Sequence, residues 1–393
     1  MSSMKKIIAG LFIGAILAAG YNGLANTGCT VEEPQPSKHR AGIVLEEFIY
    51  MKADFPSCHS ATILELTNGD LLCTFFGGTY ERHPDVEIRL SRKKPGGKWS
   101  APVSVANGIQ PVGNRMPTWN PVLFKPKGGD VMLFYKVGPN PRDWWGEVKT
   151  SKDNGNTWSE AKKLEGKIVG PIKNKPVQLK DGTILSGSST EKDGWIPHIE
   201  RSTDGGKSWT YIGPLTDPEK LGAIQPAILT YPDGRLQMLA RTRYNDNGYI
   251  AEGWSKDKGL TWSEMKPLGL PNNNSGLDAV TLKDGRQLLI YNHATRNQPK
   301  MGHKGRGVIN LAISKDGKSW EAALVLDYID GVEKQYSYPS IIQTSDGLVH
   351  IVYTWHRERI KHVVIDPNKL VTYPIIKGKW PSDKIPLVTS TEK

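Results

Sequence analysis

The chain has 393 residues and a formal net charge of +11, with 23% charged and 8% aromatic residues. The basic excess is spread along the sequence and forms no arginine-rich run, so it does not match the footprint of a nucleic-acid-binding protein, and nucleic acid is not an expected partner. Diffuse positive charge still attracts anionic ligands over long range, and an acidic carbohydrate fits this balance.

The N-terminus has the pattern of an export signal. Two lysines precede an apolar run from Ile7 to Gly20, which is followed by small residues. This pattern predicts a signal peptide over residues 1–28, a short linker to about residue 41, and export to the periplasm, the medium or the cell surface. The run is shorter than the ~20 apolar residues that a membrane-spanning helix needs. A second interpretation stays open, in which acylated Cys29 anchors the protein to a membrane as a lipoprotein.

A short motif recurs along the chain at intervals of about 50 to 60 residues. The pattern S-x-D-x-G-x-x-W occurs at Ser151–Trp158, Ser202–Trp209 and Ser255–Trp262, with a copy one residue shorter at Ser314–Trp320 and a degenerate copy at Ser91–Trp99. In such a turn the Asp and Ser side chains accept hydrogen bonds from backbone amides, Gly takes a positive φ, and Trp packs beneath the hairpin. Repetition at this period predicts a repeat architecture and a structural role for the motif.

A second kind of turn alternates with this motif. Each of these turns separates two short apolar segments, at Asn68-Gly69, Asp181-Gly182, Asp233-Gly234, Asp284-Gly285 and Asp346-Gly347. Such dipeptides favour two-residue β-hairpins. Each repeat unit therefore predicts strand, glycine turn, strand, strand, S-x-D turn and strand, which is a four-stranded antiparallel blade.

Six such units fit into the chain and predict an all-β fold, a six-bladed β-propeller over residues 42–370, followed by a C-terminal tail at 371–393. The inner strands are expected to begin near His59, Asn120, Lys175, Gln225, Asp278 and Tyr338. The segment 42–50 has no unit of its own and is predicted to supply the outer strand of the last blade. Seven blades remain an alternative, since propellers have between four and eight.

The three cysteines do not form a disulfide framework. Cys58 and Cys73 lie on the two strands of the first predicted hairpin, but the pairing set by its turn does not place them opposite each other. Both are expected to be small buried thiols.

Strand direction sorts the polar residues between the two ends of the propeller. The start of the first strand of a blade and the end of the second strand share one end, and both kinds of turn then lie at the other end. The residues expected at the first end are His59, Asp85, Asn120, Lys173, Lys175, Gln225, Arg241, Asp278, Arg306, Tyr338 and Arg357. Charged and aromatic side chains that converge at one end of an apolar scaffold indicate a ligand site.

The S-x-D-x-G-x-x-W copies resemble the Asp-box, or BNR, repeats of the sialidase superfamily, and the resemblance covers about residues 42–367. It implies a Tyr nucleophile paired with a Glu, an Asp acid/base, and three Arg that hold the substrate carboxylate. Carried over blade by blade, it implies that Tyr338 is the nucleophile and Asp85 the acid/base. Arg241 and Arg306 match the second and third arginines.

Two positions depart from that pattern. His59 stands where the family has its first arginine, and Gln225 stands where it has the Glu that activates the Tyr. Asp278, at the start of the next inner strand, is a carboxylate that could compensate. His59 is expected to assist a two-arginine clamp only while it is protonated, below about pH 6.5. Further substrate contacts are expected from Asn120, Lys173, Lys175, Asp278 and Arg357.

The first hypothesis for function is therefore a secreted exo-glycosidase that hydrolyses a terminal acidic sugar from a glycan without a cofactor. A second is a polysaccharide lyase directed at uronates, with His59 and Tyr338 as base and acid. A third is a glycan-binding propeller without activity. No group of His, Cys and Asp has the spacing of metal ligands, so no metal is expected.

Overall fold

The computed structural model describes residues 40–243, 248–295, 298, 301–331 and 333–387. The predicted signal peptide and Cys29 lie outside these residues. Within the described ranges, no helix is long and apolar enough to cross a membrane. The regular structure of the described residues is mainly β-strand, with a 3₁₀ turn, η2, at His303–Gly305.

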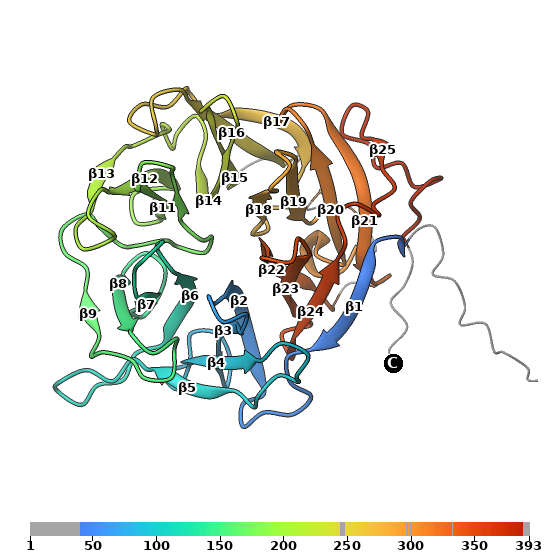
Figure 1. Ribbon diagram of the computed structural model, residues 1–393. Helices are drawn as coiled ribbons and strands as arrows, with labels where there is room; N and C mark the ends of the chain where they lie inside the picture. Colours follow the sequence, from blue (N-terminus) through green and yellow to red (C-terminus); the bar gives the residue numbers. More distant parts are fainter. Residues whose placement is uncertain (1–39, 244–247, 296–297, 299–300, 332, 388–393) are drawn as a thin grey trace, which may run out of the picture. The chain divides into compact units, whose positions relative to one another are not determined.

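Six antiparallel sheets surround a common axis, so the predicted six-bladed propeller is confirmed (Figure 1). Blade one contains β2 (Ser57–Glu65), β3 (Leu71–Gly78), β4 (Glu87–Lys93) and β5 (Val103–Ala106), and blade two β6 (Thr118–Phe124), β7 (Val131–Val137), β8 (Trp145–Ser151) and β9 (Lys162–Lys163). Blade three contains β10 (Val177–Gln178), β11 (Ile184–Thr190), β12 (Ile196–Ser202) and β13 (Thr210–Ile212), and blade four β14 (Ala223–Thr230), β15 (Leu236–Thr242), β16 (Tyr249–Ser255) and β17 (Lys266–Pro271).

Blades five and six complete the ring. Blade five contains β18 (Asp278–Thr281), β19 (Gln287–Tyr291), β20 (Val308–Ser314), β21 (Trp320–Tyr328) and β25 (Tyr373–Pro374), and blade six β22 (Tyr336–Gln343), β23 (Val349–Trp355), β24 (Arg359–Ile365) and β1 (Ile43–Phe48). β1 pairs antiparallel with β24, with Glu47 opposite His362, so the first strand in the chain closes the last blade as predicted. Part of the segment expected as a tail, β25, adds a fifth strand to blade five.

The core lies between neighbouring blades. Middle strands such as β7 and β20 are buried along their whole length because both of their faces are covered by adjacent blades. One apolar cluster joins blades five and six around Leu311 and Ile351, and another joins blades one and two around Leu72 and Leu133. Full burial of one such side chain contributes about 1.5–3 kcal/mol, so these interfaces supply much of the stability that holds the ring together.

The S-x-D turns repeat one hydrogen-bond pattern. In the second copy Ser202 donates to Asp204, the amide of Gly206 donates to the Ser202 hydroxyl, and Ser208 donates through both its amide and its hydroxyl to Asp204. These hydrogen bonds, with that of the Ser208 side chain the largest, lower the pKa of Asp204. The turn therefore needs this carboxylate ionised as an acceptor.

The S-x-D turns pack against the preceding blade beside its glycine turn. In the copy at Ser255–Trp262, Gly259 has φ +83°, and a Cβ there would lie 2.7 Å from the side chain of Leu185, the second residue of β11. Glycine is thus required by both conformation and space. Because β11 starts directly after the Asp181-Gly182 turn, this end of the blade is opposite to the end where β11 finishes. The predicted separation of the turns from the polar residues agrees with this strand geometry.

Cys58 and Cys73 are free and buried, as expected. Their opposite residues are Gly77 and Ile63. The turn-based register places Cys58 opposite about Thr79 and Cys73 opposite about Leu64, so the observed partners differ by two residues and one residue; a bulge between His59 and Thr62 accounts for one residue of the shift at Cys58.

Candidate active site

Four inner strands carry a bulge near their first residues, where the pairing register shifts. At each bulge a residue other than glycine adopts a positive φ: Ser60, Asn120, Gln225 and Tyr338, at +58°, +38°, +56° and +53°. This conformation is costly for residues with a Cβ and is often retained at functional positions. Asn120 is 4% exposed. The bulges thus mark the end of the propeller where the sequence predicts the site.

Tyr338 lies among side chains from several blades. The amide Nε2 of Gln225 donates a hydrogen bond to the Tyr338 hydroxyl at 3.3 Å. The His59 ring lies 4.1 Å from the Tyr338 ring between centroids. The guanidinium of Arg241 lies 5.4 Å and the ammonium of Lys173 lies 5.9 Å from the ring centre of Tyr338. The structure therefore brings together these five residues, which the sequence had assigned to one site.

His59 is buried and held in place by Thr354, whose hydroxyl lies 2.9 Å from Nδ1 of His59. Burial is the main reason that the pKa of His59 falls well below 6.5, and the cations Arg357, Arg306, Arg241 and Lys173 lower it further. His59 is therefore neutral at neutral and mildly acidic pH. The expectation that it joins the clamp as a cation below pH 6.5 is wrong, because the cations around it repel an added proton.

Three arginines face this group. Arg241 is 6% exposed, and its guanidinium lies 5.0 Å from the ring centre of Trp195 and 5.4 Å from that of Tyr338. Burial lowers the pKa of Arg306 to about 10, and the charge of Tyr338 opposes that shift, whereas Arg241 and Arg357 add to it. In the described part of the chain, Nε of Arg241 and Nε of Arg306 have no hydrogen-bond acceptor. Buried donors without a partner are costly, so this arrangement suits an anionic ligand.

Lys173, Lys175 and Asp278 form polar links between inner strands. The ammonium of Lys173 donates to Asn174 and to the carbonyl groups of Leu277 and Pro339, at 2.6–2.9 Å, which accounts for its three N–H groups. Burial lowers its pKa to about 7. The ammonium of Lys175 donates a hydrogen bond to the Asp278 carboxylate at 2.9 Å, and this carboxylate also accepts a hydrogen bond from the backbone amide of Ile341. These contacts join blades three, five and six, and they direct the carboxylate of Asp278 to Lys175.

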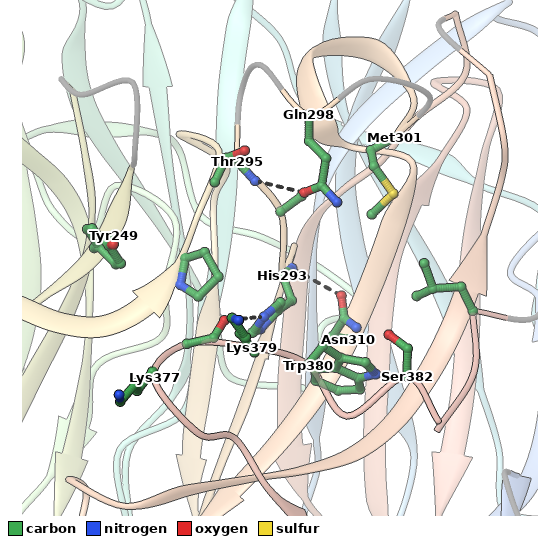
Figure 2. Close-up of a pocket in the computed structure, with 14 residues that line it drawn as sticks. Tyr249, His293, Thr295, Gln298, Met301, Asn310, Lys377, Lys379, Trp380 and Ser382 are labelled. Atoms are coloured by element: carbon green, nitrogen blue, oxygen red, sulfur yellow. Dashed lines mark hydrogen bonds between the residues drawn. The ribbon is translucent and has the colours of Figure 1, made fainter. Parts of the chain in front are cut away.

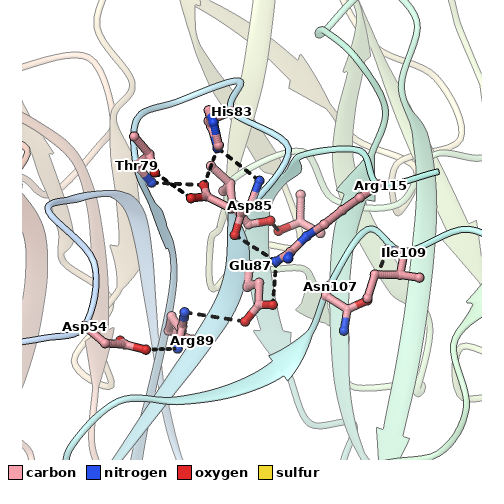
Figure 3. A network of polar contacts seen from close by, with 11 residues as sticks. Asp54, Thr79, His83, Asp85, Glu87, Arg89, Asn107, Ile109 and Arg115 are labelled. Atoms are coloured by element: carbon pink, nitrogen blue, oxygen red, sulfur yellow. Dashed lines mark hydrogen bonds and ion pairs between the residues drawn. The ribbon is translucent and has the colours of Figure 1, made fainter. Parts of the chain in front are cut away.

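Asp85 lies in a different environment, on the loop between β3 and β4 (Figure 3). Its carboxylate accepts hydrogen bonds from the backbone amide and the hydroxyl of Thr79, at 3.0 and 2.5 Å. Nδ1 of His83 lies 2.7 Å from Oδ1 of Asp85. Burial raises the pKa of Asp85, but the hydrogen bonds from Thr79 and the contact with His83 outweigh burial and lower it. Neighbouring Glu87 pairs with Arg115 and Arg89. Among the described residues, the Asp85 carboxylate thus contacts its own loop, and its backbone carbonyl accepts a hydrogen bond from Arg115.

Two carboxylates that strand direction places at the same end, but to which the resemblance assigns no role, lie near the arginines. Glu81, four residues before Asp85, forms an ion pair with Arg357 at 2.8 Å and is close enough to Arg306 to affect its pKa. Burial raises the pKa of Glu191, although Arg241 and a hydrogen bond with Trp195 lower it. In the sequence, Glu81 is indicated only by its position in the same loop as Asp85. The contact with Arg357 in the structure distinguishes Glu81 from Asp85.

A separate cavity of about 450 Å³ lies beside blades four and five and the C-terminal segment (Figure 2). His293, Asn310, Lys377 and Trp380 contribute to its lining. Both ring nitrogens of His293 have partners, the Tyr291 hydroxyl and the Gly378 carbonyl, and burial lowers its pKa to about 4. The described lining of this cavity contains no carboxylate, and it shares no residue with the group around Tyr338. No group of three or more potential metal ligands occurs among the residues described.

The fold and this group of side chains define a six-bladed Asp-box propeller with cations gathered around a tyrosine at one end. The model of the BNR repeat-like domain family matches residues 69–351, and the chain belongs to this family, within the sialidase superfamily. A sialidase of Bacteroides fragilis is 25% identical over 311 residues, which are 68% of this chain and 54% of that protein. The chain thus spans about half the length of that relative.

Solved structures of low sequence identity share the fold. The intramolecular trans-sialidase of Ruminococcus gnavus aligns with a TM-score of 0.64 at 16% identity, covering 83% of this chain and 98% of the other. The α-L-arabinanase of Penicillium chrysogenum aligns with a TM-score of 0.62 at 17% identity, covering 84% and 99%. Since proteins named for different sugars share this propeller, the substrate has to be argued from the site.

Proposed function

We propose that the protein is a glycoside hydrolase that removes a terminal acidic sugar from a glycan. The observation that carries the proposal is the convergence of Arg241, Arg306 and Arg357 on Tyr338 and His59, with the Nε donors of Arg241 and Arg306 buried and without an acceptor among the described residues. In the same part of the chain, the terminal nitrogens of Arg306 make only long hydrogen bonds of 3.3 Å, to Gln335 and the Asn274 carbonyl. Arginine binds carboxylates through two parallel hydrogen bonds, so these donors suit a sugar that carries a carboxylate. Arg357 adds a third cation and offsets the replacement of the family's first arginine by His59.

In this proposal Tyr338 is the nucleophile. A neutral phenol group avoids the repulsion that a carboxylate nucleophile would exert on an anionic sugar, and tyrosine is a known exception to the two-carboxylate mechanism. Gln225 orients the hydroxyl through its amide, which donates to the phenol oxygen. The Oε1 atom of Gln225 is buried without a partner in the described structure and suits a hydroxyl group of the sugar as donor.

The uronate-directed lyase remains a second candidate because of one specific observation. The His59 ring lies 4.1 Å from the Tyr338 ring between centroids, and a uronate carboxylate bound by the arginines would offset the cations that repel a proton from His59, so the imidazole could accept the proton from the carbon next to that carboxylate. An elimination of this kind does not require the Glu that activates the tyrosine in the family, so the presence of Gln225 at that position does not prevent it. The same arginines would then neutralise the uronate.

A product assay on matched substrates separates these functions. Aryl and glycan-linked derivatives of sialic acid and of glucuronic acid are incubated with the protein, and both reducing sugar and ultraviolet absorbance are followed. We expect reducing sugar without absorbance from an acidic substrate. An unsaturated, absorbing product would replace the hydrolase by the lyase, and binding without either product would leave only a glycan-binding role.

We also propose that the protein acts after export, because the pattern of residues 1–28 is that of a signal peptide. The mass of the mature N-terminus in the producing cell tests this proposal. A cleaved chain supports export, a lipid mass on Cys29 supports anchoring, and an intact Met1 in the cytoplasm would contradict both.

A further inference from the structure

The loop between β3 and β4 holds two carboxylates, Glu81 and Asp85, with opposite surroundings. Within the loop, Thr79 donates hydrogen bonds to both carboxylate oxygens of Asp85, and His83 contacts one of them. The side chain of Glu81 is 38% exposed and pairs with Arg357, whose side chain is 24% exposed. The side chain of Asp85 is equally exposed, at 38%, so the two carboxylates differ in their contacts: Glu81 pairs with the arginine group, whereas Asp85 is hydrogen-bonded within the loop.

Arg357 is held at this place by a strained turn. His356 and Arg357 follow β23 with φ of +53° and +67°, two consecutive values usually met by Asn and Gly in tight hairpins. The amide of Cys58 donates to the Arg357 carbonyl at 2.8 Å, which ties the turn to blade one. Among the cations that lower the pKa of His59, Arg357 contributes most after burial. A bulky cation at such a turn indicates a position kept for its side chain.

We propose that Glu81 is the acid/base carboxylate of this site, and that it takes up its proton when the carboxylate of the substrate binds Arg357. The inference rests on the proposed function and names a residue for its proton transfer. In the free protein, the Glu81 carboxylate forms an ion pair with the guanidinium of Arg357. A sugar carboxylate that binds Arg357 brings a second negative charge beside Glu81, and protonation of Glu81 relieves the repulsion between them.

The proton then follows a balanced path. The Tyr338 oxygen attacks the anomeric carbon as a phenolate, having released its proton to solvent, while protonated Glu81 gives its proton to the glycosidic oxygen and the bond to the leaving sugar breaks. In the second half, ionised Glu81 accepts a proton from water, the water oxygen bonds to the anomeric carbon, and the bond to Tyr338 breaks. The acidic sugar then leaves, Glu81 releases its proton to solvent and pairs again with Arg357, and the Tyr338 phenolate takes up a proton from solvent, so both residues return to their starting states.

The first test compares leaving groups in Glu81→Gln. Without the acid, kcat/KM for a glycan-linked substrate, which reports the first half of the reaction, should fall by about 10²–10⁴-fold. For an aryl glycoside, whose phenol leaves without a proton, kcat/KM should fall by less than about tenfold, while kcat falls for both substrates because the second half has lost its base. The matched control is Glu87→Gln, which removes another arginine-paired glutamate of the same hairpin, paired with Arg115 at 2.6 Å, and should leave both rates unchanged. The same pattern in Asp85→Asn or Glu191→Gln, with Glu81→Gln unaffected, would overturn the assignment.

The second test measures proton uptake on binding and does not require turnover. Calorimetric titration with sialic acid and glucuronic acid, in two buffers of different ionisation enthalpy, should show proton uptake by the wild type and none by Glu81→Gln. Glu81→Asp, which keeps a carboxylate, should retain uptake and control for misfolding. Uptake with no hydrolysis would support the Glu81–Arg357 linkage and reject the hydrolase, whereas binding and hydrolysis without uptake would reject the linkage alone. If neither acid binds, both proposals fail.

Discussion

The two ends of each blade differ in how far they repeat. At the end with the S-x-D turns, Asp204 and Asp257 accept the same hydrogen bonds from a Ser or Thr four residues later. At the opposite end, the equivalent bulges carry Gln225 in blade four and Tyr338 in blade six. The turn residues that repeat from blade to blade therefore make interactions that stabilise each blade. The bulge residues that differ from blade to blade are the ones that supply the side chains of the site.

The largest effect on turnover is expected at Tyr338, the proposed nucleophile at the site end of the blades. Tyr338→Phe removes only the hydroxyl group and should lower turnover by at least about 10³-fold, while binding of an acidic sugar changes little. The corresponding change at an exposed tyrosine, Tyr80→Phe, serves as the control. Measured kcat within tenfold of the wild type would remove Tyr338 from the mechanism, because tenfold is only about 1.4 kcal/mol of transition-state stabilisation.

The closure of the ring predicts the next effect, on stability rather than on activity. His350 contacts His362 at 3.0 Å, and His362 contacts Glu47 of the closing strand β1 at 2.9 Å. Burial, followed by the charge of His362, lowers the pKa of His350 to about 4; Lys93 also lowers it, and Asp346 and Glu47 raise it. The unfolded chain, with an ordinary pKa near 6.5, therefore binds the proton more strongly.

Stability should accordingly be complete above about pH 6.5 and fall as the pH decreases to about 4, by roughly 3 kcal/mol from this group. His350→Gln should flatten this part of the curve, measured by chemical unfolding at intervals between pH 4 and 7. His83→Gln, on the exposed loop of blade one, is the control. A slope that persists in His350→Gln would mean that other groups cause it.

A smaller effect is expected from the arginines at the site end. Arg306→Gln should weaken binding of an acidic sugar by about ten- to a hundredfold, because it removes a charge-assisted contact. It should also raise the pKa of His59 toward its ordinary value, since one of the repelling cations is gone. Titration of His59 by NMR measures the second effect, and an unchanged His59 pKa would contradict the arrangement of these cations.

Much of the fold could be predicted from the sequence because its turns depend on local chemistry. Gly259 and Asp257 have the same roles in the structure as in the motif, and the closing strand followed from counting units. The site was predicted only as a set of residues at one end. The protonation of His59 depends on cations from several blades, and the choice between Glu81 and Asp85 depends on the position of Arg357, which sequence spacing does not reveal.

The smallest effect is expected at the repeated end, and it tests the comparison directly. Asp204→Ala and Asp257→Ala each remove the acceptor of one turn, and each should lower the free energy of unfolding by about 1–2 kcal/mol, the usual cost of losing such a cap. Because both turns lie at the end away from Tyr338, kcat and KM should stay within about twofold of the wild type, which corresponds to less than 0.5 kcal/mol. Thermal unfolding and steady-state kinetics measure the two quantities. Equal losses of stability with unchanged kinetics are the expected result. A large kinetic effect from either variant would show that the two ends are coupled, and the division between folding residues and site residues would then fail.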